Sequence, residues 1–320
     1  MFVASLFRWK LDVYLRKTVE IVQQSYDVGM FTTAHTTKIA AAALAAATLF
    51  SLAACTSEDP AASETTSSNS SASSNADSST LRVASDLTYP PYAYTDNNNP
   101  AGFDVDMSNA LAEKMGKKAQ FIDTRFEQLI PSINSGRADI IASALYITKE
   151  RAKQVDYIPY FMTGNSIVVK EGGPDLKTVT DLCGLKVGAI KGGDIVDQLR
   201  NDGSDQCKAA GKDAIDVQEF PTDPEATQAL VSGQVDAQVN DAAVATTLGK
   251  NGSVKIKITS DELLYPIPVG LAVKKGNTAL EKKVVKALDD MKSDGSYDKL
   301  LKQYNLKEPD DAAVKKALGE

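Results

Sequence analysis

Apolar and polar residues divide the chain into three regions. An apolar run of 16 residues, IAAAALAAATLFSLAA, occupies positions 39–54 and is followed directly by Cys55. Residues 56–80 are rich in Ser, Thr and Ala and almost free of large apolar side chains, which is typical of a flexible linker. From Leu81 onward, short apolar runs alternate with helical patterns, so we expect the folded part to begin there.

Strands and helices are expected to alternate throughout the folded part. Strands are predicted at 81–86, 139–145, 166–170, 185–190, 215–220, 236–240 and 270–275. Helices are predicted at 106–117, 127–135, 194–200, 223–233, 278–292 and 296–304, and a further helix carries Arg151. Alternation of this kind indicates the α/β class.

Polar residues suited to helix N-termini stand where several of these helices would begin. Asp104 or Asp106 is a candidate N-cap for the first helix, and Thr148 for the helix that carries Arg151. Asp223 is a candidate N-cap because Pro224 follows it, and proline suits the first helical position.

A short sequence recurs in the two halves of the folded part. SGRAD at 135–139 is echoed by SGQVD at 232–236, and in both a helix would end on Ser-Gly shortly before a strand. The echo suggests two α/β lobes of similar topology. Ligands bind beyond the carboxyl ends of the strands in such sheets, so two facing lobes would form a binding cleft.

The apolar run at 39–54 has the length of a signal-peptide core and is shorter than the ~20 residues of a membrane-spanning helix. The tetrapeptide Leu52-Ala53-Ala54-Cys55 resembles a bacterial lipobox, in which the cysteine is acylated, for example with palmitate, and becomes the new N-terminus. We therefore expect residues 1–54 to be a removed signal peptide, with Met30 as an alternative start. A buried Ala-rich helix is the structural alternative. Residues 55–80 would tether the folded part to the outer face of the cell membrane.

Composition and charge narrow the function. The chain has 35 Lys and Arg, 42 Asp and Glu and a net charge of −7, an acidic balance that argues against nucleic-acid binding. Its single histidine, His35, precedes Cys55, so the mature protein would lack histidine. That excludes Ser-His-Asp and Cys-His catalysis and histidine-ligated zinc. No cofactor and no metal ion are expected.

Several segments together resemble the family-3 extracellular solute-binding proteins, the receptors of bacterial ABC importers for amino acids. They include LRVASDLTYPPYAY, AGFDVDMSNALAEKMG and SGRADIIASALYITKER, and the resemblance covers about residues 81–306. It implies a two-lobed periplasmic-binding-protein fold of type II, with two hinge strands that cross near 166–172 and 267–272. Lobe 1 would hold 81–168 and 270–306, lobe 2 would hold 169–269, and 307–320 would form a C-terminal tail.

The resemblance also implies a ligand site. Arg151 would hold the carboxylate of the ligand and Asp241 its α-ammonium, while Tyr89 and Phe126 would place aromatic rings around its side chain. From the residues alone, Arg151 could instead be a surface arginine paired with an acid, Asp241 could cap a helix at 242–248, and the two rings could be ordinary core. Asp86 is either a second contact to a cation or a loop cap.

Three further residues lie at family positions that bind the polar end of the ligand. Ser143 and Tyr146 match this region, although Tyr146 departs from the Ser or Thr that is frequent there. Asp194 replaces a hydroxyl residue and offers no donor to a carboxylate. Together with the other acids and rings, these departures favour a ligand with a strong cation.

Two cysteines remain after Cys55. Outside the cytoplasm, Cys183 and Cys207 are expected to form a disulfide bond, and two buried thiols are the alternative.

The expected function is capture of a polar amino acid or a similar zwitterion and its delivery to the permease subunits of an ABC importer, by a monomer that closes its cleft on the ligand. The alternatives are an enzyme similar to cyclohexadienyl dehydratase and a ligand-sensing domain, because fold alone does not fix function.

Overall fold

The computed structural model describes residues 79–250 and 254–320. The predicted signal peptide, the lipidation site at Cys55 and nearly all of the predicted tether lie outside the described residues. None of the helices in the two described ranges has the length and apolar content needed to cross a membrane.

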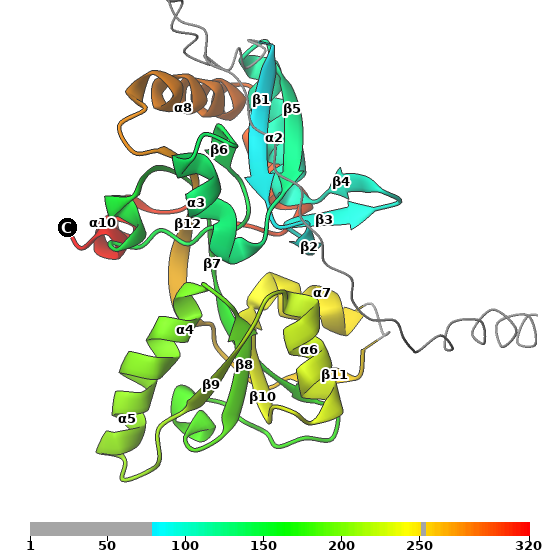
Figure 1. The fold of residues 1–320 in the computed structure, drawn as a ribbon, viewed down its shortest axis with the longest axis vertical. Helices are drawn as coiled ribbons and strands as arrows, with labels where there is room; N and C mark the ends of the chain where they lie inside the picture. Colours follow the sequence, from blue (N-terminus) through cyan, green and yellow to red (C-terminus); the bar gives the residue numbers. More distant parts are fainter. Residues whose placement is uncertain (1–78, 251–253) are drawn as a thin grey trace, which may run out of the picture. The chain divides into compact units, whose positions relative to one another are not determined.

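The strands confirm the expected alternation, and most of them form one mixed sheet (Figure 1). This sheet has the order β5-β1-β6-β12-β7-β10-β8-β9, and β11 also pairs with β7. Its strands are β1 (Thr80–Ser85), β5 (Lys118–Asp123), β6 (Ile140–Ile141), β7 (Val155–Lys170), β8 (Lys186–Ile190), β9 (Asp216–Phe220), β10 (Ala237–Asp241), β11 (Ile256–Ile258) and β12 (Leu264–Lys274). A small second sheet contains β2 (Thr88–Tyr89), β3 (Ala93–Asp96) and β4 (Asn99–Ala101).

Helices connect most of these strands. The α-helices are α2 (Phe103–Lys114), α3 (Leu129–Asn134), α4 (Asp194–Gln198), α5 (Ser204–Ala209), α6 (Asp223–Ser232), α7 (Ala242–Lys250), α8 (Thr278–Ser293), α9 (Ser296–Gln303) and α10 (Asp311–Leu318). Short 3-10 turns are η1 (Phe126–Gln128), η2 (Arg151–Lys153) and η3 (Val179–Leu182), and η4 (Leu199–Gly203) is a π-helical turn. The predicted C-terminal tail contains α10, which contacts β12.

Buried side chains form two groups, which we call lobe 1 and lobe 2. The lobe 1 clusters combine residues up to and including Phe161 with residues of β12, α8 and α9. The lobe 2 clusters are drawn mainly from residues between Ile167 and Ala245. Val244 of α7 is an exception, because it packs in the lobe 1 core and brings the start of α7 against that lobe.

The strands β7 and β12 run between the lobes as an antiparallel pair (Figure 1). On β7 the core contacts change lobe between Phe161 and Ile167, and on β12 between Tyr265 and Ile267. Both crossings lie a few residues before the predicted 166–172 and 267–272. The predicted strand at 166–170 covers only the last five residues of the 16-residue β7.

Two predicted helix caps are wrong. Gly102 precedes α2, and the buried carboxylate of Asp104 instead accepts a hydrogen bond from Ala144 N–H at 2.8 Å. Thr222, rather than Asp223, caps α6 by accepting from Glu225 N–H. Thr148 does accept from Arg151 N–H as expected, at 3.2 Å, although the helix there is a single 3-10 turn.

Other predicted elements differ in length. The strand expected at 139–145 pairs only at Ile140–Ile141, and the following residues form the turn that carries Ala144 at a φ of 45°. The echoed Ser-Gly positions agree with the prediction, because Gly136 and Gly233 both adopt left-handed conformations after α3 and α6, with φ of 77° and 78°.

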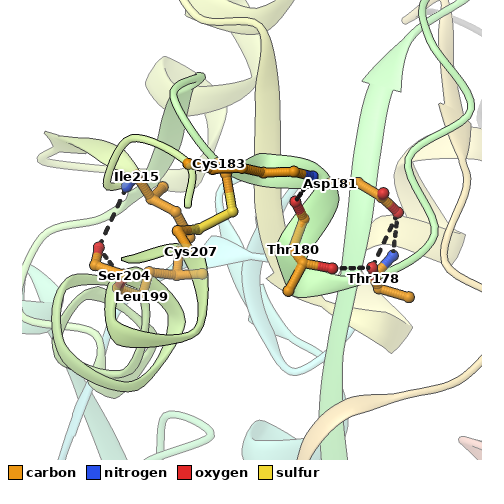
Figure 2. The surroundings of a disulfide bond; sticks show 9 residues. Thr178, Thr180, Asp181, Cys183, Leu199, Ser204, Cys207 and Ile215 are labelled. Carbon is orange, nitrogen blue, oxygen red and sulfur yellow. Dashed lines mark hydrogen bonds between the residues drawn. A yellow bond between two sulfur atoms is a disulfide. The ribbon is translucent and has the colours of Figure 1, made fainter. Parts of the chain in front are cut away.

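The disulfide bond expected between Cys183 and Cys207 is present in lobe 2, with 5.5 Å between the two Cα atoms. Figure 2 shows that it joins the segment after η3 to α5. Beside it, Ser204 Oγ donates to Leu199 O at 2.9 Å and accepts from Ile215 N–H at 3.2 Å. The covalent bond and these hydrogen bonds fix α5 to the lobe 2 core.

Candidate functional site

A cavity between the lobes gathers six of the eight predicted ligand residues. The space inside it that a water-sized sphere can occupy is about 20 Å³, room for about one water molecule, so the surrounding side chains are packed closely in this structure. The predicted residues that line it are Tyr89, Phe126, Tyr146, Arg151, Asp194 and Asp241. The residues come from both lobes, so this cavity is the candidate ligand site.

Arg151 lies at the rim of lobe 1 and reaches lobe 2. Its Nη1 donates to Tyr146 O at 3.0 Å and its Nη2 to Gly192 O at 2.9 Å, while the guanidinium carbon lies 5.6 Å from the centre of the Phe126 ring. A guanidinium has five N–H donors. The remaining N–H groups can therefore donate hydrogen bonds to an anionic group in the cavity.

The loop that contains Gly192 approaches lobe 1 closely. Gly192 has a φ of 75°, and a Cβ there would lie 3.1 Å from the Cα of Glu127 in η1. Lys191 Nζ forms an ion pair with Glu127 Oε2 at 2.8 Å beside it. Both the left-handed conformation and the close approach require glycine at this position.

Asp241 ends β10 in lobe 2 and is fully surrounded by donors. Its Oδ1 accepts from Tyr92 Oη at 2.9 Å and from Ala243 N–H at 2.9 Å, so the carboxylate also caps α7. Its Oδ2 accepts from Tyr146 Oη at 3.0 Å and from Thr163 Oγ1 at 2.7 Å. Burial raises the pKa of the Asp241 carboxyl, and these hydrogen bonds oppose that rise.

Tyr146 spans the cavity. Its backbone oxygen accepts from Arg151, and its hydroxyl contacts both Asp241 Oδ2 and Asn165 Oδ1, the latter at 3.3 Å. Since a tyrosine hydroxyl carries one proton, the two acceptors share it. Burial, followed by the charge of Asp241, raises the pKa of Tyr146 well above the usual value, so the hydroxyl remains a donor.

Asp194 starts α4 on the lobe 2 side of the cavity. Gly193 is the N-cap, and the Asp194 carboxylate accepts from Gln198 Nε2 at 2.7 Å. Burial raises the pKa of the Asp194 carboxyl, and the positive charge of Arg151 acts against that rise. The two charges, one from each lobe, are therefore close enough to interact.

Asp86 and Ser143 do not line the cavity. Asp86 accepts from Arg125 Nη1 and from Phe126 N–H, both at 3.0 Å, and from the Thr88 hydroxyl at 2.6 Å. Its own N–H donates to Ser143 Oγ at 2.9 Å. In this structure Asp86 is thus a loop cap that is paired with Arg125, and Ser143 supports it. This is the alternative that the sequence left open for Asp86.

The sequence reasoning missed two buried amides in the cavity, Asn165 and Asn240, which are 2% and 4% exposed. Asn165 lies opposite Asp241 in the pairing of β7 with β10. The signal for it was the polar Thr163-Gly164-Asn165 stretch, which interrupts the apolar residues in the middle of β7.

Metal ligation finds no support within 79–250 and 254–320, where no three His, Cys, Asp or Glu side chains are grouped to hold an ion. The chemistry that the cavity offers is recognition: a guanidinium, buried carboxylates, amides and aromatic rings.

Known proteins with similar sequences are named as amino-acid-binding proteins. The L-arginine-binding protein of Pseudomonas aeruginosa is 31% identical over 237 residues, covering 72% of this chain and 89% of that protein. The ABC transporter glutamine-binding protein of Bacillus subtilis is 36% identical over 216 residues, covering 65% of this chain and 74% of that protein.

Among solved structures, an ancestral arginine-binding protein bound to arginine is 40% identical, with a TM-score of 0.63, and covers 71% of this chain and 98% of its own. The same comparison finds that protein bound to glutamine. The expected two-lobed type II periplasmic-binding-protein fold is thereby confirmed. The family model described as bacterial extracellular solute-binding proteins, family 3, matches residues 81–307. The chain is therefore a member of the family-3 bacterial extracellular solute-binding proteins.

Proposed function

We propose that this chain is the receptor of an ABC importer and captures an amino acid or a similar small zwitterion. One observation carries the proposal: the cavity holds the Arg151 guanidinium from lobe 1 and the Asp241 carboxylate from lobe 2, with the rings of Tyr89, Phe126 and Tyr146 around them. An α-amino acid has the complementary charges, a carboxylate for Arg151 and an ammonium for Asp241.

Binding in this arrangement drives closure of the lobes. A ligand that bridges Arg151 and Asp241 makes both contacts only when the lobes are together, so it favours the closed state over the open one. The strands β7 and β12 act as the hinge. The permease subunits of the importer recognise the closed form, and the protein works as a monomer without a cofactor.

The family description gives an extracellular location. We propose in addition that Cys55 is acylated and that residues 55–80 tether lobe 1 to the outer face of the cell membrane. The lipobox-like Leu52-Ala53-Ala54-Cys55 and the linker composition of the following residues support this anchor.

The ligand class supported by relatives is amino acids. The Pseudomonas aeruginosa protein is named for L-arginine and the Bacillus subtilis protein for glutamine. These names differ in side-chain charge, so they support the amino-acid class and leave the side chain to the residues of this cavity.

A thermal-shift screen of residues 79–320 with the twenty amino acids, polyamines, betaine-type zwitterions and prephenate tests the proposal. A ligand at 100 times its dissociation constant adds about 2.7 kcal/mol to the free energy of unfolding. At this size that raises the melting midpoint by roughly 5–10 °C. We expect such a shift with at least one amino acid and none with prephenate.

The enzyme alternative has its own readout. Release of phenylpyruvate from prephenate would replace capture by catalysis, and no shift with any zwitterion would overturn the amino-acid assignment. Loss of uptake after deletion of the gene separates a transport receptor from a sensing domain.

A further inference from the structure

The cavity contains a buried hydrogen-bond donor that the protein does not use. The Nδ2 of Asn165 has no hydrogen-bond partner among the described residues, although the residue is 2% exposed and lines the cavity. An unpaired donor at such depth is costly, and native proteins rarely retain one without a function. An acceptor atom on a bound ligand would remove that cost.

The Asn165 amide is oriented with its oxygen toward Tyr146, which leaves its nitrogen as the free atom. Its Oδ1 lies 3.3 Å from Tyr146 Oη and shares the single hydroxyl proton with Asp241, and its position on β7 is fixed opposite Asp241. When a ligand ammonium replaces the Tyr146 hydroxyl on Asp241, that hydroxyl still has Asn165 Oδ1 as its acceptor. The exchange therefore reinforces the orientation of the amide and keeps Nδ2 available.

The acceptors near Asn165 are already occupied. Asp241 receives four hydrogen bonds of 3.0 Å or less, from Tyr92, Ala243, Tyr146 and Thr163. Asp86, the acid that could have held a distant cation, lies outside the cavity and is paired with Arg125. Apart from Asp194 beside Arg151, the described residues of the cavity offer no free carboxylate for a cationic side chain.

A second amide in the cavity, that of Asn240, also has an assigned orientation. Asn240 Oδ1 accepts from Asp241 N–H at 2.8 Å and from Tyr89 Oη at 3.1 Å, which fixes its oxygen because a backbone N–H can only donate. Its Nδ2 faces the buried Asp223, whose pKa it lowers, and makes no hydrogen bond of good geometry in the described structure. The Asn240 nitrogen is therefore directed at Asp223, which leaves Asn165 Nδ2 to act as the donor toward a ligand.

We propose that Asn165 determines specificity by donating from Nδ2 to an acceptor on the side chain of the ligand. The site then selects an amino acid with a neutral carbonyl on its side chain, a carboxamide or a ureido group, over one with a cationic side chain. This inference rests on the proposed function and replaces the expectation of a strongly cationic ligand.

The test is calorimetric titration of residues 79–320 with two matched pairs: L-citrulline against L-arginine, and L-glutamine against L-lysine. Citrulline has a carbonyl oxygen where arginine has a guanidinium nitrogen, so the first pair isolates the acceptor. We expect the wild type to bind the carbonyl-bearing member of each pair at least about tenfold more tightly.

Two variants then address Asn165 itself. Asn165→Asp exchanges the donor for a carboxylate and should reverse the preference toward arginine and lysine. Asn165→Leu removes both polar atoms at similar size and should weaken glutamine and citrulline by about tenfold without strengthening arginine. The leucine variant decides the question if the aspartate variant does not fold. Asn134→Asp, at an exposed position, is the control for the added charge and should leave the ratios unchanged.

The possible titration results distinguish failure of this inference from failure of the proposed function. If the wild type prefers arginine and lysine, or if the Asn165 variants weaken all four ligands equally, the inference is overturned while the proposed function stands. If no amino acid binds the wild type at all, the proposed function fails and the inference fails with it.

Discussion

The hydroxyl of Tyr146 in lobe 1 donates to the carboxylate of Asp241 in lobe 2, with 3.0 Å between Tyr146 Oη and Asp241 Oδ2. This hydrogen bond occupies the place that a ligand ammonium needs on Asp241. Because Tyr146 also contacts Asn165 Oδ1, its hydroxyl can leave Asp241 without losing every partner. Tyr146 is therefore both part of the cavity wall and a competitor of the ligand.

Tyr146→Phe removes this competitor. We expect the ligand-free protein to lose about 1 kcal/mol of unfolding free energy, and the ligand to produce a larger stabilisation than in the wild type. Urea unfolding with and without ligand measures both. Tyr92→Phe is the matched control, because its hydroxyl binds the other oxygen of Asp241 and Tyr92 does not line the cavity. An unchanged or smaller ligand response in Tyr146→Phe would contradict the competition.

The buried carboxyl of Asp104 gives the stability a pH dependence. Burial raises the pKa of this carboxyl from its usual value of 3.8 to about 7. Between these pH values the folded state binds more protons than the unfolded state, so the contribution of Asp104 to stability falls as the pH rises. The largest slope for one group is about 1.4 kcal/mol per pH unit.

Asp104→Asn should abolish that contribution. The unfolding free energy of the variant should therefore rise relative to that of the wild type from pH 4 to pH 7. Urea unfolding at four pH values measures the difference. Tyr160→Phe keeps the charge but removes a hydroxyl that donates to Asp104, so it should retain the decline. A difference between wild type and Asp104→Asn that is constant across this range would refute the assignment.

The disulfide bond should contribute substantially to the stability of lobe 2. It closes a loop between residues 24 apart in sequence, for which the loop-entropy estimate is about 3 kcal/mol. Reduction, or the Cys183→Ala/Cys207→Ala double variant, should lower the melting midpoint by roughly 5–15 °C. Adding reductant to the double variant is the control and should have no further effect. A wild-type midpoint that is insensitive to reductant would argue against a structural role.

Lipidation is tested at Cys55. We expect the exported protein to sediment with membranes and its N-terminal peptide to carry acyl chains, and Cys55→Ala to abolish both. Peptides that contain Cys183 or Cys207 serve as the internal control. An unmodified Cys55 in the mature wild type would rule out the anchor.

Much of the fold could be predicted from the sequence because its signals are local. Alternation of apolar runs with helical patterns located each of the predicted strands and helices, although β7 and β12 begin well before the predicted positions. The strands β2 to β5 and β11 and the helices α5 and α10 were not predicted. The caps at Asp104 and Asp223 could not be assigned in this way. The carboxylate of Asp104 is used 40 residues further along the chain, by Ala144 N–H, and Gln238 Nε2 donates to Asp223. An acidic residue near a helix start looks the same in both roles.

In the candidate site, too, the residues in local motifs could be predicted, and those whose role depends on contacts in the folded chain could not. Arg151, Asp241, Tyr89, Phe126 and Tyr146 stand in recognisable motifs, and the structure lines one cavity with them. Asp86 stands in the same motifs but faces Arg125 instead. Asn165 was missed because its importance lies in an unpaired donor, and whether a buried atom has a partner is a property of the folded molecule alone.

In the proposed binding mode, Arg151 binds the carboxylate and Asp241 the ammonium of one ligand. The most direct measurement is a double cycle between protein and ligand by titration calorimetry. The best amino acid found in the screen is compared with its amide, which lacks the carboxylate charge, and with its N-acetyl form, which lacks the ammonium. Each ligand is measured on the wild type, Arg151→Ala and Asp241→Asn, with the exposed Arg137→Ala as control.

We expect each change to weaken binding of the amino acid by roughly 30-fold or more in the wild-type background. Arg151→Ala should erase the difference between acid and amide, and Asp241→Asn the difference between free and acetylated amine. If the protein change and the ligand change each weakened binding by the full amount even when combined, these residues would not hold these groups. That result would contradict the proposed binding mode.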